Sequence, residues 1–168
     1  MRMTKILLVE DSRFLRIAME RALARAGYKV VSAEDGLQAI ELAGKERPNL
    51  ILLDMLLPKM GGQEVLAALK KNPSTAGIGV VACTGLSQKN AARLKKDGVC
   101  AFLDKSSLEL DKGSEKLLDA VAGILRETAN GSSANSRCRD VRRPLLPDVG
   151  NHRRLPSVIV NRPHSRMP

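Results

Sequence analysis

Short apolar runs alternate with helically spaced apolar positions over roughly residues 4–127 of the chain. The run Leu50–Asp54 (LILLD) is apolar up to its final aspartate, which is typical of a parallel strand covered on both faces. The pattern predicts strands over Lys5–Val9, Tyr28–Ala33, Leu50–Asp54, Ile78–Thr84 and Ala101–Leu103. It predicts helices over Arg13–Ala26, Leu37–Gly44, Gln63–Lys71, Ser87–Lys96 and Ser114–Glu127, with Ser87 as a helix cap.

Two helices have apolar stripes that we expect to face a core. In the last helix the stripe is Leu117, Leu118, Val121, Ile124 and Leu125, and in the first it is Phe14, Ile17, Ala18 and Ala22. Five strands that alternate with five helices favour an α/β fold, a doubly wound five-stranded parallel sheet with helices on both faces. Right-handed crossovers leave few topologies, and the flavodoxin-like strand order 2-1-3-4-5 is the common one at this size.

The composition changes after Ala129. Residues 129–168 hold five of the eight prolines and eight arginines, but only two short apolar clusters. We therefore expect a folded domain over residues 1–128 and a disordered, basic C-terminal tail over 129–168. The net charge of +10 divides into +4 for residues 1–128 and +6 for the tail, so it cannot by itself indicate nucleic-acid binding by the domain. The three cysteines lack metal or disulfide spacing, and Cys83 and Cys100 are expected in the core.

Polar residues follow the predicted strands on one edge of the sheet. Glu10-Asp11 follow the first strand, Asp54 ends the third, Thr84 ends the fourth and Lys105 comes after the fifth. Taken singly, such a carboxylate is often a helix cap, such a lysine is usually solvated, and such a threonine commonly satisfies a turn. Together, however, they suit a ligand site, because parallel sheets bind ligands beyond the carboxyl ends of their strands. The all-oxygen carboxylate set favours Mg²⁺ over zinc.

Crowded carboxylates, a lysine and Mg²⁺ suit one reaction well, the attack of a carboxylate on a phosphoryl group. The chain has no Walker A, GxGxxG or kinase motif, so the phosphoryl group should come from a partner. No run of apolar residues is long enough to span a membrane and no signal-peptide pattern is present, so we expect a cytoplasmic protein without membrane insertion.

These residues resemble the receiver domain of bacterial two-component response regulators, and most closely its single-domain, chemotaxis-regulator-like members. The most specific stretch runs from Asp54 to Gly62 (DMLLPKMGG), which is similar to the phosphoacceptor loop of the family. The resemblance implies that Asp54 accepts a phosphoryl group from a sensor histidine kinase or phosphotransfer protein. It also implies that Mg²⁺ is bound by Asp11, Asp54 and the backbone carbonyl of Leu56, with Glu10 acting through water.

The resemblance further implies how a signal would leave the site. Lys105 would pair with phosphoryl oxygens, Thr84 would move toward them, and Phe102 would rotate inward, although plain core packing is an alternative for Phe102. A downstream protein would then recognise the face made by the fourth helix, the fifth strand and the fifth helix. The protein would be a switch that catalyses its own phosphoryl transfer and slow autodephosphorylation, and not a turnover enzyme.

Three positions depart from the family pattern. Ser106 stands where the family usually has a proline in a cis bond, which leaves the Lys105–Ser106 bond open between trans and cis. The connection Ser106–Gly113 is longer and more polar than usual, which affects where the last helix starts. Leu56 and Leu86 are apolar where many members are polar, so we predict slower loss of phosphate than in a variant with Leu56→Asn and Leu86→Lys.

The alternative function is a DNA-binding regulator, or a truncated transcription regulator, that uses the arginine-rich tail. Against a nucleic-acid role, the tail has neither aromatic residues to stack on bases nor the periodicity of a recognition helix. The tail could also be a dispensable extension or a foreign reading frame. The complete acidic set with Lys105 argues against a receiver that serves only as a scaffold. Leu56 argues against an aspartyl-phosphate hydrolase, because such enzymes need an acid at this position.

Overall fold

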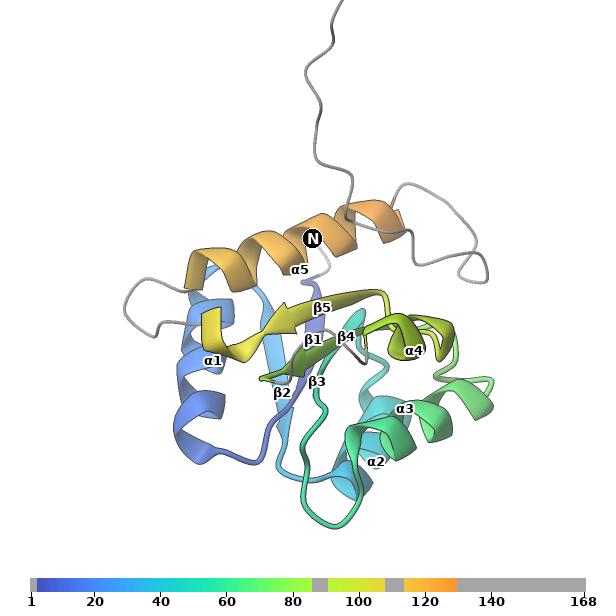
Figure 1. Ribbon diagram of the computed structural model, residues 1–168. Coiled ribbons are helices and arrows are strands. Elements are labelled where there is room, and N and C mark those ends of the chain that lie inside the picture. The colour runs from blue at the N-terminus through green and yellow to red at the C-terminus, as the bar shows by residue number, and fades with distance from the viewer. Residues whose placement is uncertain (1–2, 86–90, 108–113, 130–168) are drawn as a thin grey trace, which may run out of the picture.

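The computed structural model describes residues 3–85, 91–107 and 114–129, and its strands form one parallel sheet (Figure 1). The sheet has five strands in the order β2-β1-β3-β4-β5, which confirms the flavodoxin-like prediction. The strands are β1 (Lys5–Val9), β2 (Lys29–Ala33), β3 (Leu50–Asp54), β4 (Gly79–Thr84) and β5 (Ala101–Asp104). The helices are α1 (Arg13–Arg25), α2 (Gly36–Glu46), α3 (Gly62–Lys71), α4 (Ala91–Lys96), the short 3-10 helix η2 (Lys105–Ser107) and α5 (Ser114–Ala129).

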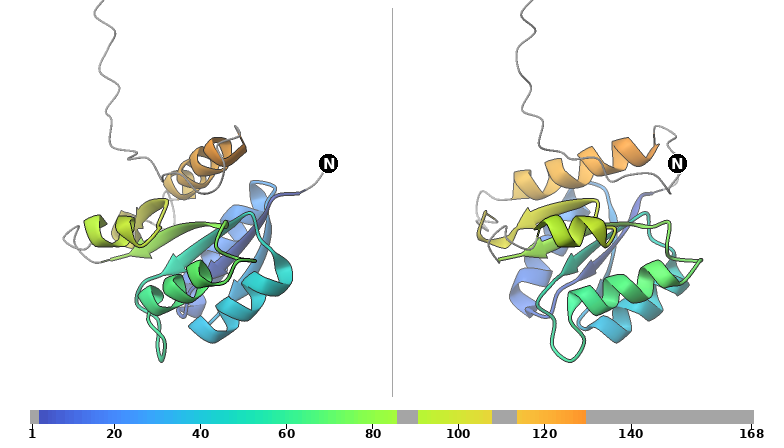
Figure 2. Two further views of the ribbon diagram at one scale, coloured as in Figure 1. Left: turned by 90° about the vertical axis from the view of Figure 1, so that its right-hand side faces the viewer. Right: turned by 45° about the vertical axis from the view of Figure 1, so that its right-hand side comes forward.

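Helices cover both faces of this sheet (Figures 1 and 2). Alternate residues of β3 point to opposite faces, so Ile51 and Leu53 pack with α2, α3 and α4, whereas Leu50 and Leu52 pack with α1 and α5. All four side chains are completely buried. Burial of one such leucine stabilises the fold by roughly 1.5–3 kcal/mol, so β3 is the centre of the molecule and holds Asp54 in a fixed place.

The apolar stripe of α5 lies where the sequence predicts it. Leu117, Val121 and Ile124 are buried against the sheet, and Leu118 and Leu125 pack beside them. None of the described helices is long and apolar enough to cross a membrane.

The stripe expected for α1 is wrong at Phe14, whereas Ala22 is partly buried against the core as expected. Phe14 is 72% exposed, and the buried residues of the helix are Arg16, Met19 and Leu23. At about 3.6 residues per turn, the nine positions from Phe14 to Leu23 place these two side chains on opposite sides of the helix. Because Met19 and Leu23 occupy the core face, Phe14 on the opposite side of the helix faces solvent.

Several element ends differ from the sequence prediction by one or two residues. Tyr28 and Ile78 lie just outside β2 and β4, β5 extends to Asp104, and α2, α3 and α5 are longer than expected. The ends of α1 and α4 are set by Gly27 and Gly98, whose positive φ angles of 88° and 97° suit glycine. The predicted cap Ser87, residues 108–113 of the connection and the part of the tail after Ala129, for which disorder is expected, lie outside the described residues.

Candidate functional site

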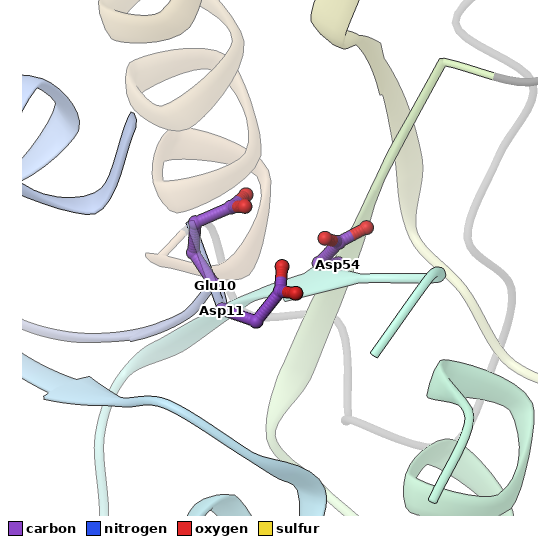
Figure 3. A group of neighbouring side chains, drawn as sticks. All are labelled: Glu10, Asp11 and Asp54. Carbon is purple, nitrogen blue, oxygen red and sulfur yellow. The ribbon is translucent and has the colours of Figure 1, made fainter. Parts of the chain in front are cut away.

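The ends of β1 and β3 bring three carboxylates together. The two strands are neighbours with Val9 opposite Leu53, so Glu10-Asp11 and Asp54 emerge side by side. Oxygen atoms of the three acids lie within 4.8 Å of one another, and their carboxyl groups face a common space (Figure 3). Glu10 and Asp54 are buried, at 1% and 2% exposure, whereas Asp11 is exposed.

Glu10 is fixed by contacts of both its backbone and its side chain. Its backbone N–H donates to the carbonyl of Ala33 at 3.1 Å, and its Oε1 accepts from the N–H of Ser12 at 3.3 Å. Burial raises the pKa of Glu10 above its ordinary value of 4.5, although the contact with Lys105 opposes this shift. An ionised Glu10 therefore depends on a nearby positive charge.

Asp54 is the most constrained of the three acids. Its Oδ1 accepts a hydrogen bond from the N–H of Leu56 at 2.9 Å, and its Oδ2 lies 2.5 Å from Nζ of Lys105. The side chain of Leu56 itself is exposed. The carboxylate of Asp54 is thus held at a fixed orientation, close to the carboxylates of Glu10 and Asp11.

Lys105 lies between two of the acids, at the start of the 3-10 helix that follows β5. Its Nζ is 2.7 Å from Oε2 of Glu10 as well as 2.5 Å from Asp54. Burial alone would lower the pKa of Lys105, but the contacts with Asp54 and Glu10 outweigh it and raise the pKa above 10.5. The Lys105–Ser106 bond is trans, since the described residues contain no cis peptide, and Lys105 reaches both carboxylates with serine in place of proline.

The residues present fit a divalent cation. Three carboxylates and one lysine leave a net charge of −2 if all are ionised, and hard oxygen ligands in a site open at Asp11 suit Mg²⁺. Glu10, Asp11 and Asp54 would supply the side-chain oxygens. The backbone of Leu56 adjoins them through its N–H contact with Asp54.

Gly62 provides the space in which the loop after β3 closes. A Cβ atom at this position would lie 2.6 Å from the carbonyl oxygen of Asp54 and 2.6 Å from Cα of Met55. Both atoms belong to the backbone and cannot move aside without moving Asp54. The glycine in the DMLLPKMGG stretch is therefore a steric requirement of the site.

Thr84 and Phe102 lie on the neighbouring strands β4 and β5. Thr84 is opposite Asp104 and Ala82 is opposite Phe102, so Thr84 and Phe102 point to the same face of the sheet, two residues apart in register. Both side chains are half-buried, and Phe102 packs against the core on the α2–α3–α4 side. Leu86 lies outside the described residues.

The sequence analysis missed Arg16, a buried arginine of α1 that contacts the backbone of the site. Its Nη1 donates to the backbone carbonyl of Glu10 at 2.8 Å. One signal was available in the sequence, because Arg16 has the helical spacing of Met19 and Leu23 and therefore lies on their buried face.

Comparison with known proteins gives one consistent family. Residues 6–120 match the response regulator receiver domain. The chain is 30% identical to response regulator MprA of Mycobacterium leprae over 79% of its own length and 55% of that protein. It is 44% identical to sporulation initiation phosphotransferase F of Bacillus subtilis over 39% of its length and 53% of that protein, so it spans about half of these curated relatives. The crystal structure of chemotaxis protein CheY4 of Vibrio cholerae superposes with a TM-score of 0.67 at 27% identity, covering 73% of this chain and 99% of that one.

Proposed function

The chain belongs to the response regulator receiver domain family, and from this membership we propose that it is a switch operated by phosphorylation of Asp54. Receivers of this family are signalling proteins and not turnover enzymes. The observation that carries the proposal is the pairing of a buried Asp54 with Lys105 beside the carboxylates of Glu10 and Asp11.

In the proposed reaction, a carboxylate oxygen of Asp54 attacks the phosphorus atom of a phosphohistidine on a partner kinase or phosphotransfer protein. A new O–P bond forms, the P–N bond breaks, and its electron pair returns to the imidazole. The N–H of Leu56 and the ammonium of Lys105 orient the attacking carboxylate. Asp54 is only 2% exposed, so these protein contacts set the orientation of its carboxylate.

Charge neutralisation is the main requirement of this step, because a carboxylate must approach an anionic phosphoryl group. Bound Mg²⁺ would neutralise charge on the transferring phosphoryl oxygens and on the acids. Glu10, Asp11 and Asp54 with the Leu56 carbonyl would hold it, Glu10 through water. Lys105, which now spans Glu10 and Asp54, would pair with a phosphoryl oxygen after transfer.

The proposed switch continues through Thr84 and Phe102. The hydroxyl of Thr84 would move to the phosphoryl group, and the half-buried ring of Phe102 would fill the space vacated on the same sheet face. A downstream protein would read the change on the surface of α4, β5 and α5. In this proposal, the charge of the phosphoryl group on Asp54 would shift the receiver between two conformations.

The proposal extends to the organisation and location of the protein. Residues 1–128 would form the receiver, residues 129–168 a separate tail, and the protein would act in the cytoplasm. We also propose that phosphorylated Asp54 loses its phosphate slowly, as predicted from the apolar residues Leu56 and Leu86. The exposed side chain of Leu56 lies beside Asp54 and offers no polar group to direct a hydrolytic water.

Beryllofluoride, a phosphoryl mimic, tests the proposal without a partner. Titration of the full chain followed by amide NMR should shift the signals of Leu56 and Thr84 only when Mg²⁺ is also present. Lys105→Met should lose the response, whereas Lys116→Met, at an exposed lysine on α5, should keep it. A Mg²⁺-independent response, or one that survives Lys105→Met unchanged, would count against the proposed site.

A further inference from the structure

Arg16 is a charged side chain on the core face of a helix. It is 8% exposed and shares this face of α1 with Met19 and Leu23. Burial of a guanidinium is costly unless its N–H groups are paired, so its partners indicate why an arginine occupies the position.

Those partners lie at the ends of two strands. Nη1 donates to the carbonyl of Glu10 at 2.8 Å and approaches that of Asp11 at 3.4 Å, while Nη2 donates to Oε1 of Glu34 at 2.7 Å. The planar guanidinium therefore joins the backbone after β1 to the residue that follows β2. Both backbone carbonyls belong to residues whose side chains face the acidic cluster.

We propose that Arg16 is a positioning residue for divalent-cation binding, which fixes the Glu10–Asp11 backbone so that both carboxylates face Asp54. The inference rests on the proposed function, since it takes the acidic cluster as the cation site. Asp11 is exposed and can turn away from the cluster unless its backbone is held. A rigid backbone leaves less motion to be lost when the cation binds.

The sign of the effect separates positioning from simple electrostatics. Arg16 is a cation, and a cation near the acidic cluster repels Mg²⁺, so its removal would strengthen Mg²⁺ binding if charge alone mattered. Loss of the two backbone contacts should instead weaken it. Glu34 balances the charge of Arg16, but its side chain is 70% exposed, so its own effect on the site is small.

The experiment measures Mg²⁺ affinity of the full chain by calorimetry and by the amide NMR shift of Ser12, whose N–H contacts Glu10. Arg16→Met should weaken binding by about tenfold or more, as is usual for residues that support metal ligands. Arg16→Lys, which keeps the positive charge but not the two planar N–H donor groups, should also bind Mg²⁺ more weakly than the native chain. Glu34→Gln should change affinity by no more than about twofold, because the exposed ion pair is weak.

Met19→Ala controls for lost stability, since Met19 is buried on the same helix face and its side chain carries no charge. It should lower the melting temperature and leave Mg²⁺ affinity unchanged. Native-like or tighter binding by a folded Arg16→Met overturns the inference, and if that variant does not fold, native-like binding by Arg16→Lys does so. Absence of Mg²⁺ binding by the native chain would instead overturn the proposed function itself.

Discussion

At the scale of single residues, Glu10 links the site to the stability of the fold. Burial raises its pKa, so the folded chain holds a proton on Glu10 more tightly than the unfolded chain does. The corresponding stability is fully present below the unfolded pKa of 4.5 and is lost as the pH rises through the higher folded pKa. At neutral pH without a metal, an ionised Glu10 therefore lowers the free energy of unfolding.

Glu10→Gln should remove this penalty, because glutamine does not ionise. We expect the variant to have the higher free energy of unfolding at pH 7 in the presence of a chelator, with the difference shrinking toward pH 4. Urea unfolding at the two pH values measures it. A native chain that is the more stable of the two at pH 7 would show that Lys105 outweighs the cost of burial.

Gly62 gives a second prediction at this scale. Gly62→Ala places a Cβ atom 2.6 Å from backbone atoms of Asp54 and Met55, so it should cost about 1–3 kcal/mol of stability and reduce phosphorylation. Gly44→Ala is the matched control, because no atom lies within 4 Å of the added Cβ in the interior of α2. It should be neutral or stabilising by up to about 1 kcal/mol. Equal effects of the two substitutions in chemical unfolding would contradict the steric role of Gly62.

At the scale of elements, the strands and most helices could be predicted from apolar runs, since the completely buried residues of β3 tolerate no polar side chain. The orientation of α1 could not. Its apolar residues occur on several sides, so the pattern does not single out the face of Met19 and Leu23 as the core face. Burial of Arg16 on that face also needs the carbonyls of Glu10 and Asp11 as partners. The element ends also depend on tertiary contacts, as at Tyr28 and Ile78.

The corrected orientation of α1 leads to opposite expectations for two of its residues. Met19→Ala should cost about 2–5 kcal/mol because the side chain is 3% exposed. Phe14→Ala should change stability by no more than about 0.5 kcal/mol because Phe14 is 72% exposed. Chemical unfolding of both variants tests this, and a large loss for Phe14→Ala with a small one for Met19→Ala would restore the orientation predicted from the sequence.

At the scale of the whole molecule, the parallel sheet explains why residues distant in sequence form one site. Glu10 follows β1, Asp54 ends β3 and Lys105 follows β5. Their convergence could be predicted because the carboxyl ends of these parallel strands meet at the same sheet edge. The contact of Lys105 with both acids could not be predicted, since it depends on the trans bond to Ser106 and on the turn of η2. Arg16 has the helical spacing of Met19 and Leu23, but its contacts with the backbone of Glu10 and Asp11 could not be predicted from the sequence.

The central claim is that Asp54 is the phosphoryl acceptor. The full chain should be incubated with acetyl phosphate and Mg²⁺, and the modified residue mapped by mass spectrometry. We expect one phosphoryl group on Asp54 that requires Mg²⁺, none on Asp54→Asn, and native labelling of Asp119→Asn, an exposed acid on α5. A native chain that remains unlabelled, or an Asp54→Asn variant that is labelled as well as the native chain, would contradict the claim.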